Sequence, residues 1–213
     1  MQKKVKETLE QHILPVLADR LTSIIKQVSD RKLNQLVEIR LRAGKPLMIE
    51  TVSEELLISP QGDIVSKQDQ GYLIDQQDIQ ETLNLMTNSS LYTVEEELKS
   101  GYLTLSGGHR VGFVGQVIRE ETRIKRIKYI SGLNIRLCQE IIGAADGVIE
   151  QVIAGTDDIY NTLIISPPRC GKTTLLRDLI RQISEGIPRL NFTGLKVGVV
   201  DERSELGGAY QGV

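Results

Sequence analysis

The hydrophobic positions of the first 28 residues follow a helical period. Apolar side chains recur three or four residues apart and form one stripe, which comprises Val5, Leu9, Ile13, Leu17, Leu21, Ile24 and Val28. Pro15 interrupts this stripe, and a proline inside a helix removes a hydrogen bond and clashes with the preceding turn. We therefore expect a kinked helix or two helices. His12 lies near the break, and because no His or Cys cluster surrounds it in the sequence, a surface histidine is favoured over a metal ligand.

From residue 36 the period changes to two. Val37, Ile39 and Leu41 alternate with charged residues, a turn at residues 43–46 leads into residues 47–50, and residues 55–58 form a further apolar segment before a turn at residues 60–63. This pattern predicts a small antiparallel sheet. Its arginines, Arg40 and Arg42, are expected on a solvated outer face.

Two helices and a hairpin are expected next. Asp75 is a good N-cap for a helix that runs to about residue 87, and residues 93–96 have the capping-box pattern of a second, short helix. Residues 102–105 and 110–115 alternate and are joined through two adjacent glycines, which is typical of a hairpin. Turn chemistry alone is the favoured interpretation of these two glycines, whereas Gly112 and Gly115 stand inside the second strand, where glycine marks a bulge or a close backbone approach.

A basic run at residues 119–128 (REETRIKRIK) stands out from the otherwise mixed charge. It lacks interleaved aromatic residues on which bases would stack, and two glutamates dilute it. We interpret it as a solvated segment that connects strands, with a contact to a polyanion as the alternative. Residues 129–137 return to alternation, with Ile135 and Leu137 on one face and Arg136 between them.

A phosphate-binding loop is the strongest functional signal in the chain. Residues 163–177 read LIISPPRCGKTTLLR, which is a short apolar run, a tight turn and then a segment with helical spacing. This is the pattern of the strand, loop and helix of a P-loop nucleotide site, where backbone N–H groups and the positive helix N-terminus bind phosphates. The alternative is a chance Gly-Lys-Thr at the start of a helix.

The motif gives each loop residue an expected role. The predicted nucleotide-binding residues are Ser166, Pro167, Pro168, Arg169, Cys170, Gly171, Lys172, Thr173 and Thr174. Lys172 is expected to reach the β- and γ-phosphates of ATP, and the Thr173 hydroxyl is expected to ligate Mg²⁺. Ser166 stands where such loops usually begin with glycine, and the two prolines after it remove N–H donors but pre-form a turn.

An acidic pair follows the loop helix. Apolar residues within 175–183 give that helix a buried face, residues 186–188 end it, and residues 196–200 are expected to form a strand that ends at Asp201 and Glu202. In an open α/β sheet the ligand crevice lies at the carboxyl ends of the strands. These two carboxylates are therefore predicted to orient attacking water or to hold Mg²⁺ through water, with an ordinary acidic loop as the alternative.

These patterns divide the chain near residue 143. Residues 1–143 combine helices with an antiparallel sheet and predict a smaller α+β domain. Residues 144–213 begin with a helical linker at residues 146–154 and continue as strand, loop, helix and strand, which predicts an α/β P-loop NTPase domain.

Composition narrows the function classes. Of the 213 residues, 40% are hydrophobic and 25% charged, as in an ordinary globular protein. The net charge of −2 gives no general attraction to nucleic acid or anionic lipid, so no nucleic-acid partner is expected. The sequence shows no apolar run of about 18 residues that would span a membrane and no apolar core of a signal peptide. Two cysteines are too few for a disulfide framework, which favours the cytoplasm.

Four motifs together resemble one bacterial family. EIRLRAGKPL, GGHRVGF, SPPRCGKTTLLRD and VGVVDERSELGG are similar to the stage III sporulation AA family of endospore-forming bacteria, and the resemblance covers the whole chain. That family is similar in turn to the motor ATPases of type II secretion, type IV secretion and type IV pili. The resemblance implies a RecA-like ATPase that uses ATP and Mg²⁺. It also implies a homo-hexamer docked on membrane proteins of a channel between mother cell and forespore, at the cytoplasmic face on the mother-cell side.

The resemblance also indicates where further catalytic residues lie. In such motors the N-terminal domain contributes arginines to the nucleotide, and Arg110 and Arg136 are the matching candidates; the alternative is that both face solvent or pair with carboxylates of the sheet. A later strand of such motors carries the main Mg²⁺-binding Asp-Glu pair, whereas this sequence ends at Val213. We therefore expect a fragment or truncated product with an incomplete sheet and little turnover of its own. Two alternative functions are a non-hydrolysing nucleotide-dependent docking switch and, less favoured, a nucleic-acid translocase.

Overall fold

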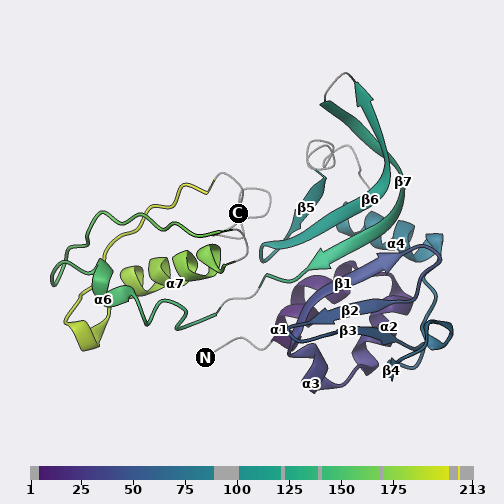
Figure 1. Cartoon of the computed structure of the whole chain (residues 1–213), viewed down its shortest axis with the longest axis horizontal. Coiled ribbons are helices and arrows are strands. Elements are labelled where there is room, and N and C mark those ends of the chain that lie inside the picture. The colour runs from purple at the N-terminus through teal and green to yellow at the C-terminus, as the bar shows by residue number, and fades with distance from the viewer. Residues whose placement is uncertain are drawn as a thin grey trace. The chain divides into compact units, whose positions relative to one another are not determined.

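The computed structural model describes residues 5–88, 101–120, 123–138, 141–167, 170–201 and Leu206 (Figure 1). These residues divide into two compact units, and the division lies between Cys138 and Gln139, a few residues before the predicted boundary. Each unit has its own cluster of buried hydrophobic residues. The functional identities predicted for the two parts stay predictions.

The N-terminal helical stripe is broken at the proline, as expected. The helical elements of the first unit are α1 Val5–Thr8, the π-helix η1 Leu9–Ile13, the 3₁₀ turn η2 Leu14–Val16, α2 Asp19–Gln27, α3 Asp30–Leu33, η3 Gln68–Gln70 and α4 Gln76–Met86. Pro15 lies in η2, after which the backbone becomes extended at Leu17. The Leu14 carbonyl accepts the Leu17 N–H at 3.3 Å and the Thr22 hydroxyl of α2 at 2.9 Å, so a side chain adds a bond at the break.

The α4 helix begins as its sequence predicts. Asp75 accepts the Asp78 N–H at 2.8 Å, and the Asp78 carboxylate accepts the Asp75 N–H at 3.1 Å, which is a complete capping box. Tyr72 adds a third bond, from its hydroxyl to Asp78 at 3.0 Å. The second helix predicted at residues 93–96 lies outside the described residues.

One antiparallel sheet collects all the strands that the structure describes. They are β1 Leu36–Arg42, β2 Met48–Thr51, β3 Glu55–Ile58, β4 Ile64–Val65, β5 Tyr102–Leu105, β6 His109–Glu120 and β7 Arg123–Arg136. Their order across the sheet is β4-β3-β2-β1-β7-β6-β5, so the last strand along the chain pairs beside the first. The predicted α+β architecture with an antiparallel sheet is confirmed, as is the hairpin of β5 and β6.

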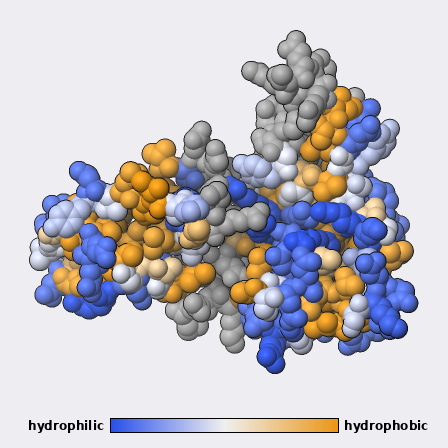
Figure 2. Space-filling view, in the orientation of Figure 1, coloured by the Kyte–Doolittle hydropathy of each residue, from blue (hydrophilic) through white to orange (hydrophobic). Residues whose placement is uncertain are grey.

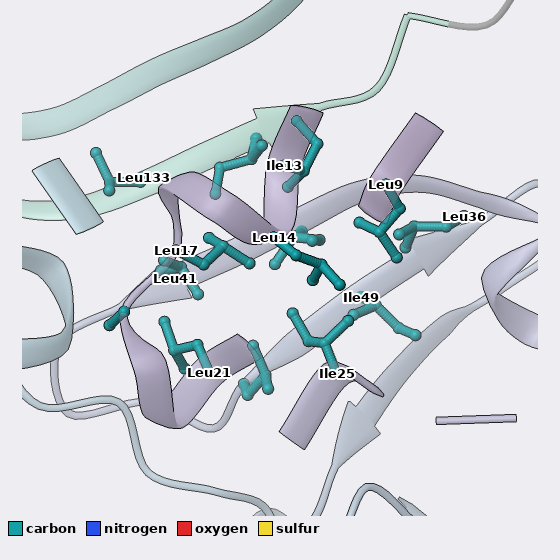
Figure 3. Packing of buried hydrophobic residues seen from close by; sticks show 14 of the residues in the cluster. Leu9, Ile13, Leu14, Leu17, Leu21, Ile25, Leu36, Leu41, Ile49 and Leu133 are labelled. Carbon is teal, nitrogen blue, oxygen red and sulfur yellow. The ribbon is translucent and has the colours of Figure 1, made fainter. Parts of the chain in front are cut away.

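The helices cover one face of this sheet. Figure 3 shows leucines and isoleucines from the N-terminal helices packed against Leu36, Leu41, Ile49 and Leu133 of the strands. Because successive side chains of a strand lie on opposite faces of the sheet, the charged residues between these apolar ones lie on the other face. Arg40 and Arg42 lie there, partly buried rather than fully solvated.

The β6 and β7 strands continue past their neighbours as a two-stranded ribbon (Figure 1). The register shifts between Val114 and Gln116, and a Cβ on Gly115 would lie 2.9 Å from the Lys128 carbonyl, so the expected bulge and close approach are at Gly115. The interpretation of residues 119–128 as a connection between strands is wrong. Apart from residues 121 and 122, which the structure does not describe, they are parts of β6 and β7, because backbone pairing does not require an apolar alternation.

In the second unit the loop helix forms as predicted. Its elements are α6 Ile149–Val152, α7 Lys172–Glu185 and the 3₁₀ turn η5 Pro188–Leu190. Gly186, with φ 84°, ends α7. The predicted helical linker over residues 146–154 is helical only in α6. The buried residues of this unit are Ala145, Ile149, Val152, Leu179, Ile183, Ile187 and Phe192.

The prediction of two strands in this unit is wrong. Residues 161–167 and 194–201 have no strand pairing, although each contains an apolar run. Leu163, Ile165 and Val200 are 83%, 82% and 99% exposed, and Figure 2 shows hydrophobic surface on this unit. An extended segment becomes a strand only when a neighbouring backbone pairs with it, and apolar side chains alone do not supply that neighbour. The loop helix predicted for this unit is confirmed. Its assignment to the RecA-like α/β class stays a prediction.

In the part of the chain that the structure describes, no helix is both long enough and apolar enough to cross a membrane.

Candidate phosphate-binding site

The phosphate loop enters α7 through a left-handed glycine. Gly171 has φ 81° and ψ 13° and directly precedes the first residue of α7. A residue with a Cβ loses about 1–2 kcal/mol in this conformation, which glycine adopts freely. Among the residues that the structure describes, no heavy atom outside its immediate neighbours lies within 4 Å of the position that a Cβ would take.

Lys172 lies across the loop. Its Nζ donates to the carbonyl oxygens of Ser166 at 3.2 Å and Pro167 at 3.4 Å. The ammonium group is thus held beside the turn that leads into the positive N-terminus of α7. These two bonds go to neutral carbonyls, whereas a bond from the ammonium group to a phosphate oxygen would join two opposite charges.

Most of the predicted nucleotide-binding residues lie in this turn or in the first turn of α7. They are, in chain order, Ser166, Pro167, Cys170, Gly171, Lys172, Thr173 and Thr174. Pro168 and Arg169 lie outside the described residues. A helix N-terminus, an ammonium group and two hydroxyl groups fit a phosphate-bearing ligand and its metal ion.

Asp201 is connected to α7 through Leu206. The Oδ2 atom of Asp201 accepts the Leu206 N–H at 2.7 Å, and the Leu206 carbonyl accepts the Nε–H of Arg177 at 3.0 Å. Arg177 lies about one and a half turns beyond Lys172 on the same helix. The acidic residue is thus tied to the loop helix by hydrogen bonds and not by the strand that the sequence predicted. Glu202 lies outside the described residues, and the catalytic roles of both acids stay predictions.

Arg110 and Arg136, the two arginines predicted to act on the nucleotide, are cross-strand partners in the first unit. The Arg136 guanidinium donates to Glu38 from Nη2 at 3.1 Å and from Nε at 3.3 Å, and its side chain is 61% exposed. The Arg110 guanidinium lies 4.9 Å from the centre of the Tyr102 ring, within cation–π range. Arg136 therefore pairs with a carboxylate of the sheet, which was the alternative interpretation of this residue. A further role of either arginine toward a nucleotide stays a prediction.

Glu38 is a buried carboxylate that the sequence did not single out. It is 4% exposed, although it alternates with apolar residues in β1, and it accepts from Arg40 at 2.6 Å as well as from Arg136. Arg40 also pairs with Glu50 and Glu55, and its hydrogen bond to Glu38 is the main cause that raises the Arg40 pKa. The long side chains of the two arginines cover the carboxylate, and the spacing of apolar residues in the sequence does not indicate that a charged residue is buried in this way.

A second buried carboxylate, Asp178, lies on α7. Its Oδ2 accepts the Ala145 N–H at 2.9 Å and the Gln182 amide at 2.9 Å, and its Oδ1 accepts Nε and Nη2 of Arg181 at 2.9 and 2.7 Å. In the sequence, the one indication that this carboxylate is buried was its place next to Leu179, which belongs to the apolar stripe of the helix. Burial alone would raise the Asp178 pKa, but these hydrogen bonds outweigh it and lower the pKa below its ordinary value of 3.8.

A buried histidine lies where β6 begins. His109 is 1% exposed, its Nδ1 accepts the Cys138 N–H at 2.8 Å, and its ring centre lies 5.5 Å from that of His12. Burial, with a smaller effect of His12, lowers the His109 pKa to about 4. Because Nδ1 is an acceptor, the proton of the neutral ring is on Nε2, which leaves no lone pair there for a metal. Across the described residues, no group of three His, Cys, Asp or Glu side chains is arranged to hold a metal ion.

The sequence of this chain is similar to proteins of one known family. Residues 7–213 match the family model described as "Sporulation stage III, protein AA". The chain is 35% identical over 201 residues to stage III sporulation protein AA of Bacillus subtilis (strain 168), a match that covers 94% of this chain and 60% of that protein. Among solved structures, the ATPase DotB of Legionella pneumophila is similar with a TM-score of 0.41 and 17% identity, over 71% of this chain and 39% of that one. The chain belongs to the sporulation stage III protein AA family.

Proposed function

We propose that this chain is the ATP-binding part of a motor ATPase that acts in sporulation. Family membership supports the sporulation role. The observation that carries the nucleotide role is the Lys172 ammonium held across a turn that enters α7 through left-handed Gly171. An ammonium group and a helix N-terminus directed at one open turn favour an anion, and phosphate is the anion that this loop sequence fits.

In this proposal each loop residue has one task. Lys172 binds the β- and γ-phosphates, and the amides from Cys170 to Thr174 bind the remaining phosphate oxygens. The Thr173 hydroxyl would hold Mg²⁺, whose chemistry when bound is to neutralise charge on the phosphates. Asp201 and Glu202 orient a water molecule or hold the metal ion through water.

The proposal also covers assembly and location. It places a homo-hexamer on membrane proteins of the channel between mother cell and forespore, at the cytoplasmic face on the mother-cell side. Family membership supports this part. The chain spans 60% of the length of its Bacillus relative, so these are properties proposed for the whole protein.

A non-hydrolysing nucleotide switch is the second candidate. One observation favours it: Oδ2 of Asp201 is engaged by the Leu206 N–H, which occupies one site that would otherwise orient water. The two candidates share the binding site and differ in turnover.

Replacing Lys172 by alanine is expected to weaken binding of ATP–Mg²⁺ about 100-fold. A lost charge-assisted hydrogen bond accounts for about 2–3 kcal/mol, and about 1.4 kcal/mol corresponds to each factor of ten. Titration calorimetry on the purified protein measures the change. The matched control is Arg189→Ala, which removes one positive charge just beyond the other end of α7, where Arg189 pairs with Glu150 at 2.5 Å.

Unchanged affinity in Lys172→Ala, or an equal loss in the Arg189 control, would contradict the phosphate-loop assignment. Steady-state release of phosphate by the full-length protein then separates the candidates. A motor hydrolyses ATP in many turnovers and loses that activity in Lys172→Ala, whereas a switch binds ATP without turnover.

Replacing Arg136 by alanine in the full-length protein is expected to slow ATP turnover at least tenfold while it changes ATP affinity less than about threefold. This is the pattern of an interaction made mainly in the transition state, where charge develops on the transferred phosphoryl group. Arg136→Lys keeps a charge beside Glu38 and separates loss of the guanidinium from disturbance of the sheet. Arg20→Ala, on α2 with a 65% exposed side chain, is the control. A turnover rate equal to wild type in Arg136→Ala would limit the residue to its pair with Glu38.

A further inference from the structure

Asp178 is a buried carboxylate of the second unit that several donors satisfy. It is 4% exposed, and its donors include the Ala145 N–H, the Arg181 guanidinium and the Gln182 side-chain amide. A buried charge without such donors would be strongly unfavourable, so the geometry of all these donors is fixed together. Gln182 extends the set because its amide nitrogen also donates to Asp146 at 2.8 Å.

The groups that Asp178 joins come from two parts of the chain. Arg181 and Gln182 belong to its own helix, whereas Ala145 and Asp146 lie 33 and 36 positions from their partners, in the segment by which the chain enters the second unit after Cys138. That segment continues into α6, whose Ile149 and Val152 are buried in the same cluster as Leu179 and Ile183 of α7. The entry segment, residues 145–153, is therefore attached to α7 by apolar packing and by one buried carboxylate.

The two kinds of attachment differ in what they fix. Apolar contacts are not directional, and side chains can slide past one another with little change in buried area. Hydrogen bonds to a buried carboxylate hold distance and angle, because a displaced donor leaves the charge unsatisfied. Asp178 thus sets the register of the entry segment along α7.

We propose that Asp178 is a positioning residue that transmits phosphate binding from the start of α7 to the entry segment. This inference rests on the proposed nucleotide site. The path is short, because α7 is one continuous helix and Asp178 lies about 9 Å along its axis from Lys172. Phosphates that engage the loop amides and the Lys172 ammonium restrain the first turn of α7. Through Asp178 the same restraint extends to residues 145–153.

Asparagine at position 178 cannot replace the carboxylate. It offers one oxygen and one NH₂ group, and the NH₂ group would face either the Arg181 guanidinium or the Ala145 N–H, both of which are donors. One set of bonds must therefore be lost, while side-chain volume is kept. The matched control is Glu185→Gln, which removes an exposed carboxylate that pairs with the same Arg181 at 2.6 Å.

The test is amide hydrogen exchange with and without a saturating non-hydrolysable ATP analogue and Mg²⁺. The readout is at Gln151 and Ile153, whose N–H groups bond to Val148 and Ile149 and not to Asp178, so loss of the Asp178 bond does not expose them directly. In wild type and in Glu185→Gln we expect the analogue to slow exchange at these amides about fivefold. In Asp178→Asn we expect less than about a twofold change, with protection of the loop amides retained. Gln182→Met, which removes the bonds to Asp146 and Asp178 without altering the charge, is a second variant and should give an intermediate value.

The outcomes separate this inference from the proposed function. Equal slowing at Gln151 and Ile153 in wild type, Asp178→Asn and Gln182→Met would overturn the positioning role. So would wild-type protection of the loop with no change in the entry segment. No protection of the loop amides of wild type at any concentration of the analogue would overturn the nucleotide site itself, and this inference with it.

Discussion

Replacing His109 by asparagine is expected to remove most of the acid sensitivity of the first unit. In wild type the unfolded chain takes up a proton near pH 6.5, whereas the folded chain does so only near pH 4, because His109 is buried and lies against His12. Between these values the unfolded state holds more protons, so the free energy of unfolding falls as the pH falls. The loss is about 2 kcal/mol between pH 7.5 and pH 5, and about 3 kcal/mol when complete.

Asparagine keeps an uncharged acceptor close to the place where His109 Nδ1 accepts the Cys138 N–H. It leaves a cavity, so the His109→Asn variant should be less stable at pH 7.5 by about 2 kcal/mol, yet nearly indifferent to pH down to 5. Exchange of core amides in β1 and β7, corrected for intrinsic rates, reports the unit by itself. The control His12→Asn retains the burial of His109 and should keep most of the pH dependence. An unchanged slope in the His109 variant would assign the acid sensitivity to another group.

Replacing Gly62 by alanine is expected to lower the free energy of unfolding of the first unit by about 3 kcal/mol. Gly62 has φ 80°, and a Cβ there would lie 2.5 Å from Gln27 Cβ and 2.9 Å from the Gln27 carbonyl carbon at the end of α2. The left-handed conformation costs about 1–2 kcal/mol, and overpacking against a helix backbone adds about as much again.

Gly44→Ala is the matched control for that substitution. Gly44 has φ 72°, and no such contact lies within 4 Å of the position of its Cβ. It should therefore show the conformational cost alone, about 1 kcal/mol. Denaturation followed by exchange of the same core amides gives both values. Equal losses at the two positions would show that the contact with α2 relaxes without cost.

The elements predicted well are those in which side chains separate a core from solvent. The helical spacing before Pro15, the apolar spacing of α4 and the alternation in β1 each record such a separation, and each predicted element is present. The loop helix α7 was predicted from a motif rather than from its apolar spacing alone. Gly171 provides the left-handed backbone before the helix, and Lys172 provides the ammonium group that the motif requires.

The predictions that failed depend on distant neighbours. Residues 163–165 have the composition of a buried strand, but Leu163 and Ile165 are exposed and none of the three belongs to a sheet. Pairing is decided by a partner segment and not by the run itself. For the same reason the sequence did not reveal the site at Asp178, whose amide partner Ala145 is 33 positions away. The burial of Glu38 likewise depends on Arg136, 98 positions further along the chain.

The placement of β7 between β1 and β6 has a consequence for biosynthesis. The hairpins from β1 to β4 are local and complete early, but β1 has no partner on its other side until β7 has been made. Ribosomes add about 5–20 residues per second, so roughly 5–20 s separate the two strands in a nascent chain. During that interval the N-terminal helices, which precede β1 along the chain, are available to cover the apolar face, but the edge of β1 that later pairs with β7 stays open. Pairing over such a separation is intrinsically slower than closing a hairpin, so we expect β7 to join β1 after the hairpins from β1 to β4 have formed.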